Sequence, residues 1–320
     1  MRLNVMLEPQ EGLSYQDILA VAQRAESLGF EGLYRSDHYT SVGGHAAMGS
    51  TDAWATLAGL ARETGRLRLG TMVSPVTFRP VGNLAKVAAT TAEMAGSVDG
   101  RARVDIGVGT GWLEEEHRQL GFPFENLDTR FRRLEEQLQV LQRLFDRDAA
   151  PFDFDGEFES LRGAQIVPVP EPRPDLIIGG TGLVRTPRLA ATFADELNTG
   201  FQGPEGAAQR RRALDRACER AGRDPATVTF SLMTGCLIGA DEREFGRRAE
   251  RLKARSGDGR PFDEWLGDLE AAWVLGTPDQ AAQRLGELAE AGVERIMLQH
   301  QLPDDLDMLD VVVEDVAPRL

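Results

Sequence analysis

The chain has 320 residues, of which 42% are hydrophobic and 27% are charged, and its formal net charge is −15 at pH 7. This composition can supply a substantial apolar core and is unlike that of a disordered chain. The acidic balance argues against a nucleic-acid partner, because a negative surface repels a phosphate backbone. We therefore expect a soluble, globular protein that does not bind nucleic acid.

The sequence lacks the features of export, membrane insertion or metal binding. Residues Met1 to Glu8 do not form the apolar core of a secretory signal, and no uncharged apolar run approaches the roughly 18 residues of a membrane span. Cys218 and Cys236 have neither a disulfide framework nor a zinc-site spacing. The histidines are dispersed, at His38, His45, His117 and His300. We expect a cytoplasmic protein with no metal and no membrane partner.

Strand-like and helix-like segments alternate along the first third of the chain. Apolar residues recur at helical spacing in Tyr15 to Leu28, which Gly29 is expected to end, and Asp52 is typical of the residue that caps a helix start. The predicted strands are residues 3–7, 32–36, 67–73 and 102–108. The predicted helices between them are residues 15–28, 52–63 and 81–95.

The alternation continues to the end of the chain. Further strands are predicted at residues 175–178, 196–199, 228–238 and 294–299. Further helices are predicted at residues 128–145, 185–193, 204–221 and 278–291, with an irregular hairpin at 152–167. Strands that alternate with helices at this period fit either an open doubly wound sheet or a closed barrel. Because the strands number eight, we predict a (β/α)8 TIM barrel.

We expect one domain over residues 1–320, with insertions at about 112–174 and 241–275. The second insertion is charged and contains a turn at Ser256 to Gly259. It could form a lid over the active site, and the alternative is a solvated pair of helices without a catalytic part. In such barrels the active site lies at the C-terminal ends of the strands.

Two glycine-rich segments follow predicted strands. Gly107, Gly109 and Gly111 remove side chains where a strand ends, so that a flat ring or a phosphate can approach the backbone. The alternative there is a β-bulge or a tight turn. Gly179 to Gly182, followed by Arg185 and a helix, fits a phosphate site of backbone N–H groups, although a plain turn is also compatible.

Asp37 and His38 form an adjacent acid and imidazole at the end of the second strand. Histidine titrates near neutral pH, so His38 is the first candidate for proton transfer. The alternative is that Asp37 caps the next loop and His38 only bonds to it. At the end of the third strand, a bulge at Met72-Val73 or Ser74-Pro75 could support a ring.

Five segments together resemble the luciferase-like monooxygenase superfamily, particularly its branch that depends on coenzyme F420. They occur in the family's order and are Arg35 to Tyr39, Leu69 to Val73, Gly107 to Trp112, Ile178 to Gly182 and Ala194 to Asn198. The resemblance implies a barrel, usually a homodimer, with a deazaflavin across the strand ends.

The resemblance also assigns roles. It implies that Asp37 and His38 face the ring and carry catalysis, that a non-prolyl cis bond at Met72-Val73 backs the ring, and that Gly179 to Gly182 hold the phosphate. With the strand-end analysis, the candidate cofactor residues are Asp37, His38, Thr71, Met72, Val73, Ser74, Gly109, Thr110, Gly111, Gly179, Gly180, Thr181, Gly182 and Arg185. The cofactor supplies the hydride chemistry.

Two departures separate this chain from the sugar-phosphate dehydrogenases of the branch. Trp112 stands where they have glutamate, and residues 40–44 lack their tryptophan, which argues against a sugar-phosphate substrate. Neither Glu8 nor Glu115 can be assigned as the missing acid from the sequence. Our leading hypothesis is an F420-dependent oxidoreductase. The alternatives are a monooxygenase that uses flavin mononucleotide (FMN) with a separate reductase, and a non-catalytic deazaflavin-binding protein.

Overall fold

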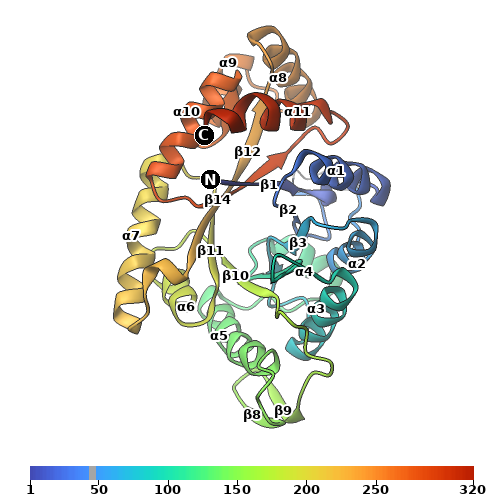
Figure 1. Cartoon of the computed structure of the whole chain (residues 1–320), viewed down its shortest axis with the longest axis vertical. Coiled ribbons are helices and arrows are strands. Elements are labelled where there is room, and N and C mark those ends of the chain that lie inside the picture. The colour runs from blue at the N-terminus through green and yellow to red at the C-terminus, as the bar shows by residue number, and fades with distance from the viewer. Residues whose placement is uncertain (43–47) are drawn as a thin grey trace.

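The computed structural model describes residues 1–42 and 48–320, and within them eight parallel strands close into a barrel that helices surround (Figure 1). Each strand pairs with the next, and the last pairs with β1, so the ring has no free edge. The strands are β1 (Arg2–Leu7), β2 (Gly32–Arg35), β3 (Arg68–Thr71), β7 (Val104–Gly109), β10 (Asp175–Gly179), β11 (Glu196–Gly200), β12 (Thr229–Ile238) and β14 (Arg295–His300). The predicted TIM barrel is confirmed.

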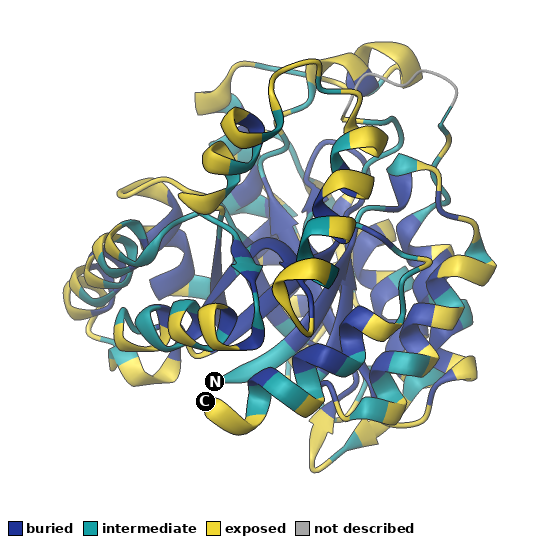
Figure 2. Ribbon diagram, turned by 90° about the horizontal axis from the view of Figure 1, so that it is seen from above, coloured by how far each residue is buried: buried dark blue, intermediate teal, exposed yellow. Residues whose placement is uncertain are grey.

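The helices between the strands begin and end close to the predicted residues. Gly29 ends the first one with a φ of 92°, and the Asp52 side chain accepts a hydrogen bond from the Ala55 N–H at 2.9 Å at the start of the second. They are α1 (Tyr15–Leu28), α2 (Ala53–Glu63), α3 (Val81–Ala95), α5 (Leu127–Leu144), α6 (Arg185–Phe193), α7 (Pro204–Ala221) and α10 (Pro278–Glu290). Figure 2 shows their outer faces exposed around buried strands.

Several shorter strands lie outside the ring of eight barrel strands. The predicted hairpin is confirmed as β8 (Phe152–Asp155) and β9 (Ser160–Ala164), and β5 (Ser97–Val98) pairs with β6 (Arg101–Ala102). The segment β4 (Ser74–Pro75) pairs with β7, and β13 (Val274–Gly276) pairs with β12. None of the helices in the described ranges is long and apolar enough to cross a membrane.

The segment 241–275 forms α8 (Glu242–Ser256), α9 (Phe262–Glu270) and β13. Leu252 and Trp265 of these helices pack with Leu302 and Met308 near the end of the chain. This end of the chain is helical from α11 (Asp307–Asp310) onward, and the two termini lie near each other (Figures 1 and 2). The inserted helices therefore share an apolar cluster with the barrel and are not simply solvated.

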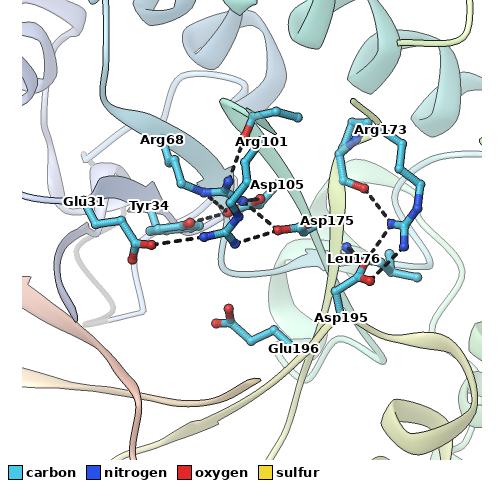
Figure 3. Close-up of polar contacts among 12 residues, drawn as sticks. Glu31, Tyr34, Arg68, Arg101, Asp105, Arg173, Asp175, Leu176, Asp195 and Glu196 are labelled. Atoms are coloured by element: carbon cyan, nitrogen blue, oxygen red, sulfur yellow. Dashed lines mark hydrogen bonds and ion pairs between the residues drawn. The ribbon is translucent and has the colours of Figure 1, made fainter. Parts of the chain in front are cut away.

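A network of buried charges lies in the interior of the barrel near the start of its strands, and Figure 3 shows the part of it around Arg68, Asp105 and Asp175. Arg295 on β14 is 1% exposed, and its Nε donates to Glu31 at 2.8 Å. The same guanidinium contacts Glu196, Tyr34 and Asn4. Burial of a charge is costly unless it is paired and hydrogen-bonded, and here each ion has partners on other segments of the barrel. Arg68 likewise forms ion pairs with Asp105 and Asp175.

Candidate active site

The C-terminal ends of the barrel strands surround a cavity of about 880 Å³. This volume lies within the range of roughly 300–1,000 Å³ that is typical of small-molecule sites. The predicted residues that border it are His38, Met72, Val73, Gly109, Thr110, Gly111, Gly179, Gly180, Thr181 and Gly182. Glu8 and Ser36 also border it, as do Gln299 and His300 at the end of β14 and Gln301 directly after it. The strand ends therefore meet in one chamber.

His38 is held at the wall of this chamber by a glutamate from the short helix that follows β7. Its Nδ1 lies 2.9 Å from Oε1 of Glu116, which is fully buried on α4 (Glu114–Leu120). The second carboxylate oxygen of Glu116 accepts from the backbone N–H of Tyr39 at 2.9 Å. Because an ionised carboxylate only accepts, Nδ1 carries the proton, and Nε2 is left for a ligand.

The pKa of His38 is raised above its ordinary value. Burial alone would lower it, but the hydrogen bond and the charge of Glu116 favour the imidazolium and prevail. The edge of the ring also meets Trp112, with the centroids 5.5 Å apart and the planes at 82°. His38 is thus a buried base that a carboxylate orients, an arrangement suited to proton transfer near neutral pH.

Replacing Glu116 by glutamine is expected to lower the pKa of His38, because burial still opposes the charge while the neutral amide no longer stabilises it. A proton NMR titration of the His38 ring measures this without a substrate. Glu115→Gln is the matched control, since Glu115 is exposed and bonds to Arg118. An unchanged titration of His38 in the Glu116 variant would show that the carboxylate does not control the imidazole.

Asp37 differs from its expected position, because it does not border the cavity. Its carboxylate forms an ion pair with Arg79, whose Nη2 lies 3.2 Å from Oδ1, and it accepts from Ser74 Oγ at 2.6 Å. The side chain of Asp37 is almost fully buried in this arrangement. His38 therefore borders the chamber, whereas the adjacent Asp37 lies behind the chamber wall. There the carboxylate of Asp37 anchors the loop through Arg79 and Ser74.

Three other candidates also lie outside the lining of the cavity. Thr71 is fully buried and donates to the carbonyl of Gly107 at 2.9 Å. The hydroxyl group of Ser74 donates its hydrogen bond to Asp37. Arg185 extends over the surface, donates to Asp128 at 2.9 Å and lies over the Phe131 ring. Thr71 and Ser74 therefore support the wall from behind, and Arg185 has competing partners away from the glycine loop.

The Met72-Val73 peptide bond is cis, as the resemblance implied, and it turns Val73 toward two neighbouring strand ends. A Cβ on Gly109 would lie 2.8 Å from Val73 Cγ2, and one on Gly179 would lie 2.7 Å from Val73 Cγ1. A Cβ on Gly107 would be only 1.9 Å from the carbonyl oxygen of Thr71. These glycines thus make room for the Met72-Val73 bulge, which then forms a wall of the cavity.

The loop Gly179 to Gly182 borders the cavity and leads into α6. The residue before this helix, Val184, provides no side-chain cap to the first N–H groups. Uncapped N–H groups at a helix start carry a partial positive charge and can bind an anion. The loop therefore has the chemistry of a phosphate site, although its predicted arginine points elsewhere.

Glu8 forms a polar wall with the end of β14. Its carboxylate accepts from Gln10 at 2.6 Å and also from Gln299, and Gln301 donates to Gln299 Oε1 at 2.8 Å. Burial raises the pKa of Glu8 above its ordinary value, although these bonds and the nearby His38 oppose the shift. Glu8 is thus a second titratable group in the same chamber.

Sequence analysis missed Glu116 and Arg79. Glu116 was visible as the third acid of a run that follows the glycine-rich strand end, and that run was the available signal. Arg79 had no local signal, because it reaches Asp37 from a separate loop. Of the dispersed histidines, His45 lies outside the described residues, as do Gly43 and Gly44 of the loop without tryptophan.

Comparisons with known proteins agree with this geometry. F420-dependent glucose-6-phosphate dehydrogenase from Rhodococcus hoagii is 29% identical, with 95% of this chain and 94% of that protein covered. The enzyme of the same name from Microbacterium testaceum is 32% identical, with 95% and 93% covered. A solved F420-dependent secondary alcohol dehydrogenase, in complex with an F420-acetone adduct, superimposes with a TM-score of 0.85 at 20% identity, with 99% and 98% covered, which shows a shared fold.

The profile of the family described as luciferase-like monooxygenase matches residues 1–295, which is most of the chain. The match spans the barrel from β1 to the start of β14 and therefore includes the segments on which the resemblance was based. The chain belongs to the luciferase-like monooxygenase family.

Proposed function

We propose that the protein is an oxidoreductase that transfers a hydride between coenzyme F420 and a small organic substrate. The observation that carries this proposal is His38, which borders the cavity and is held by the buried carboxylate of Glu116. A proton must move when a hydride converts an alcohol to a carbonyl compound or the reverse. His38 Nε2 is the atom that accepts or returns it.

The residues of the cavity fit this cofactor. The Met72-Val73 wall and the neighbouring Gly109 and Gly179 offer backbone and methyl surface to a flat ring. The loop before α6 offers backbone N–H groups to a phosphate. When bound, the deazaflavin accepts or donates the hydride. The protein binds and orients the two reactants and supplies the proton-transfer group.

In the direction of alcohol oxidation, Nε2 of His38 would accept the proton of the hydroxyl oxygen, while the hydride would leave the carbon that bears this hydroxyl group for the cofactor. The imidazolium that forms is stabilised by Glu116 through Nδ1. In the reverse direction His38 returns the proton to the carbonyl oxygen. Glu116 thus acts through His38 as a positioning residue. The ion pair of Asp37 with Arg79 holds the loop that carries His38.

We further infer that the protein works in the cytoplasm as a homodimer. Its two cysteines are unpaired and buried, which suits a reducing compartment. The dimer is carried over from the family resemblance. Sedimentation of the purified protein tests the dimer, and a sedimentation coefficient of a monomer at micromolar concentration would contradict it.

Cofactor choice is tested by titrating the purified protein with coenzyme F420 and, in parallel, with FMN, while following fluorescence at equal ionic strength. We expect saturable micromolar binding of F420 and much weaker binding of FMN. Selective binding of FMN would instead support an oxygen-using monooxygenase with a reductase partner. Binding of neither would contradict the proposed function. Tight F420 binding without turnover of any alcohol, enone or imine would favour the non-catalytic alternative.

A glycine variant makes this titration more specific. Gly179→Ala places a methyl group against Val73 and should shift the wall, so F420 affinity should fall. Gly65→Ala is the matched control, because a Cβ on Gly65 would meet no atom within 4 Å. Equal F420 affinity of both variants and the parent would show that the Val73 wall does not contact the cofactor.

A further inference from the structure

One side of the cavity is formed by the inserted helix and the segment after β14. We call it the α8 wall and define it as Leu252, Arg255, Ser256, His300, Gln301 and Pro303. Arg255 is the only lysine or arginine among the described residues that border the cavity, and its Nη2 donates to the backbone carbonyl of Glu11 at 3.0 Å. Apart from Arg255, the α8 wall therefore carries no cation and combines the apolar Leu252 and Pro303 with polar side chains, unlike a site for a phosphate group.

His300 stands out in the α8 wall because its polar atoms are not used. The residue is 4% exposed, and neither ring nitrogen has a hydrogen-bonding partner among the described residues. His117, which is equally buried, contrasts with it. Its Nδ1 lies 2.7 Å from the Leu113 carbonyl and its Nε2 lies 2.7 Å from Thr77 Oγ1. Buried polar atoms are nearly always paired, so an unpaired imidazole that borders a cavity requires an explanation.

The surroundings of His300 determine the protonation state of its imidazole ring. Burial lowers its pKa to about 4, and the charges of Asp305 and Arg248 have smaller, opposed effects. Those two residues are already paired with each other at 2.8 Å. At neutral pH the ring is therefore uncharged, with one nitrogen that donates and one that accepts. Its χ2 angle has a broad, two-fold preference, so a flip of the ring would exchange the positions of its nitrogen and carbon atoms.

We propose that His300 is a specificity-determining residue that hydrogen-bonds an uncharged hydroxyl or carbonyl group on the part of the substrate remote from the reacting carbon. A hydroxyl satisfies either ring nitrogen, because it both donates and accepts. The apolar Leu252 and Pro303 beside it would contact the carbon skeleton. The inference rests on the proposed function, since it takes the cavity to be the substrate chamber of an oxidoreductase.

The test uses two probes that differ by one remote hydroxyl group, cyclohexanol and cyclohexane-1,4-diol. They are added to the F420-loaded protein with 15N-labelled histidine, and the ring nitrogen signals are followed by NMR. We expect the diol to shift the His300 signals, with those of His117 unmoved as an internal control. The diol should also bind about tenfold more tightly than cyclohexanol, as one hydrogen bond predicts.

Two variants complete the test. His300→Phe should abolish the preference for the diol, and His300→Gln, which keeps hydrogen-bonding atoms, should retain part of it. Retention of the full preference in His300→Phe, or His300 signals that do not respond to the diol, would overturn the assignment. The F420 titration of the same samples is a separate readout. Lost F420 binding with an intact response of His300 would contradict the proposed function alone.

Discussion

Replacement of His38 by alanine is expected to lower turnover by roughly 10²–10⁴-fold, the usual loss when general acid–base catalysis is removed. The affinity for F420 should stay within a few-fold of the parent, because in the proposed function Val73 and the glycine segments, rather than the imidazole, hold the cofactor. The change should therefore appear in kcat and not in cofactor binding. Stopped-flow absorbance of F420, with an alcohol or ketone that the parent turns over, measures it.

The control for this experiment is His117→Gln, which changes a buried imidazole that has two protein partners and does not border the cavity. Its kcat, measured on the folded fraction, should exceed that of His38→Ala by a wide margin. If His38→Ala turned over at the parental rate, the imidazole would have no part in proton transfer, and Glu8 would become the next candidate.

Replacement of Arg295 by leucine is expected to cost about 3–5 kcal/mol of unfolding free energy, the range for removing one partner of a buried ion network. The substitution would leave Glu31 and Glu196 without their shared cation. Glu196, which is almost fully buried, would then have to take up a proton or water, whereas Glu31 would keep its ion pair with Arg2. Urea unfolding followed by circular dichroism at pH 7 gives the difference between variant and parent.

Arg162→Leu is the matched control, because Arg162 forms an exposed ion pair with Asp155 on the β8–β9 hairpin. Exposed pairs contribute about 0–1 kcal/mol, so this variant should unfold close to the parent. Equal unfolding free energies for the two variants would mean that the interior network is not a main source of stability.

The sequence was sufficient to predict the barrel because its strands and helices have clear periodicity and local end signals. Gly29 and Asp52 lie where a helix must end or begin, and both predictions are confirmed. Most of the site residues predicted at the strand ends also border the cavity, since parallel strands of a barrel bring their C-terminal ends to one face. These features depend on neighbours in the sequence, which is why they could be read from it.

The remaining parts of the site depend on contacts between distant segments. The packing of α4 against His38 and Tyr39 decides which glutamate of Glu114 to Glu116 points inward. The sequence of the three glutamates does not reveal this packing. Arg185 follows the glycine loop in sequence, yet Asp128 and Phe131 on α5 hold its side chain away from it. Side-chain direction is a tertiary property in both cases.

The contacts of Val73 couple the residues at three strand ends. A larger residue at position 109 or 179 collides with the Val73 methyl groups, whereas a smaller residue at 73 would remove that collision. The effect of each substitution therefore depends on which came earlier, because residues in direct contact do not contribute additively. A lineage that replaced Gly109 or Gly179 would first have to reduce residue 73, so the order of mutations restricts how this wall can change.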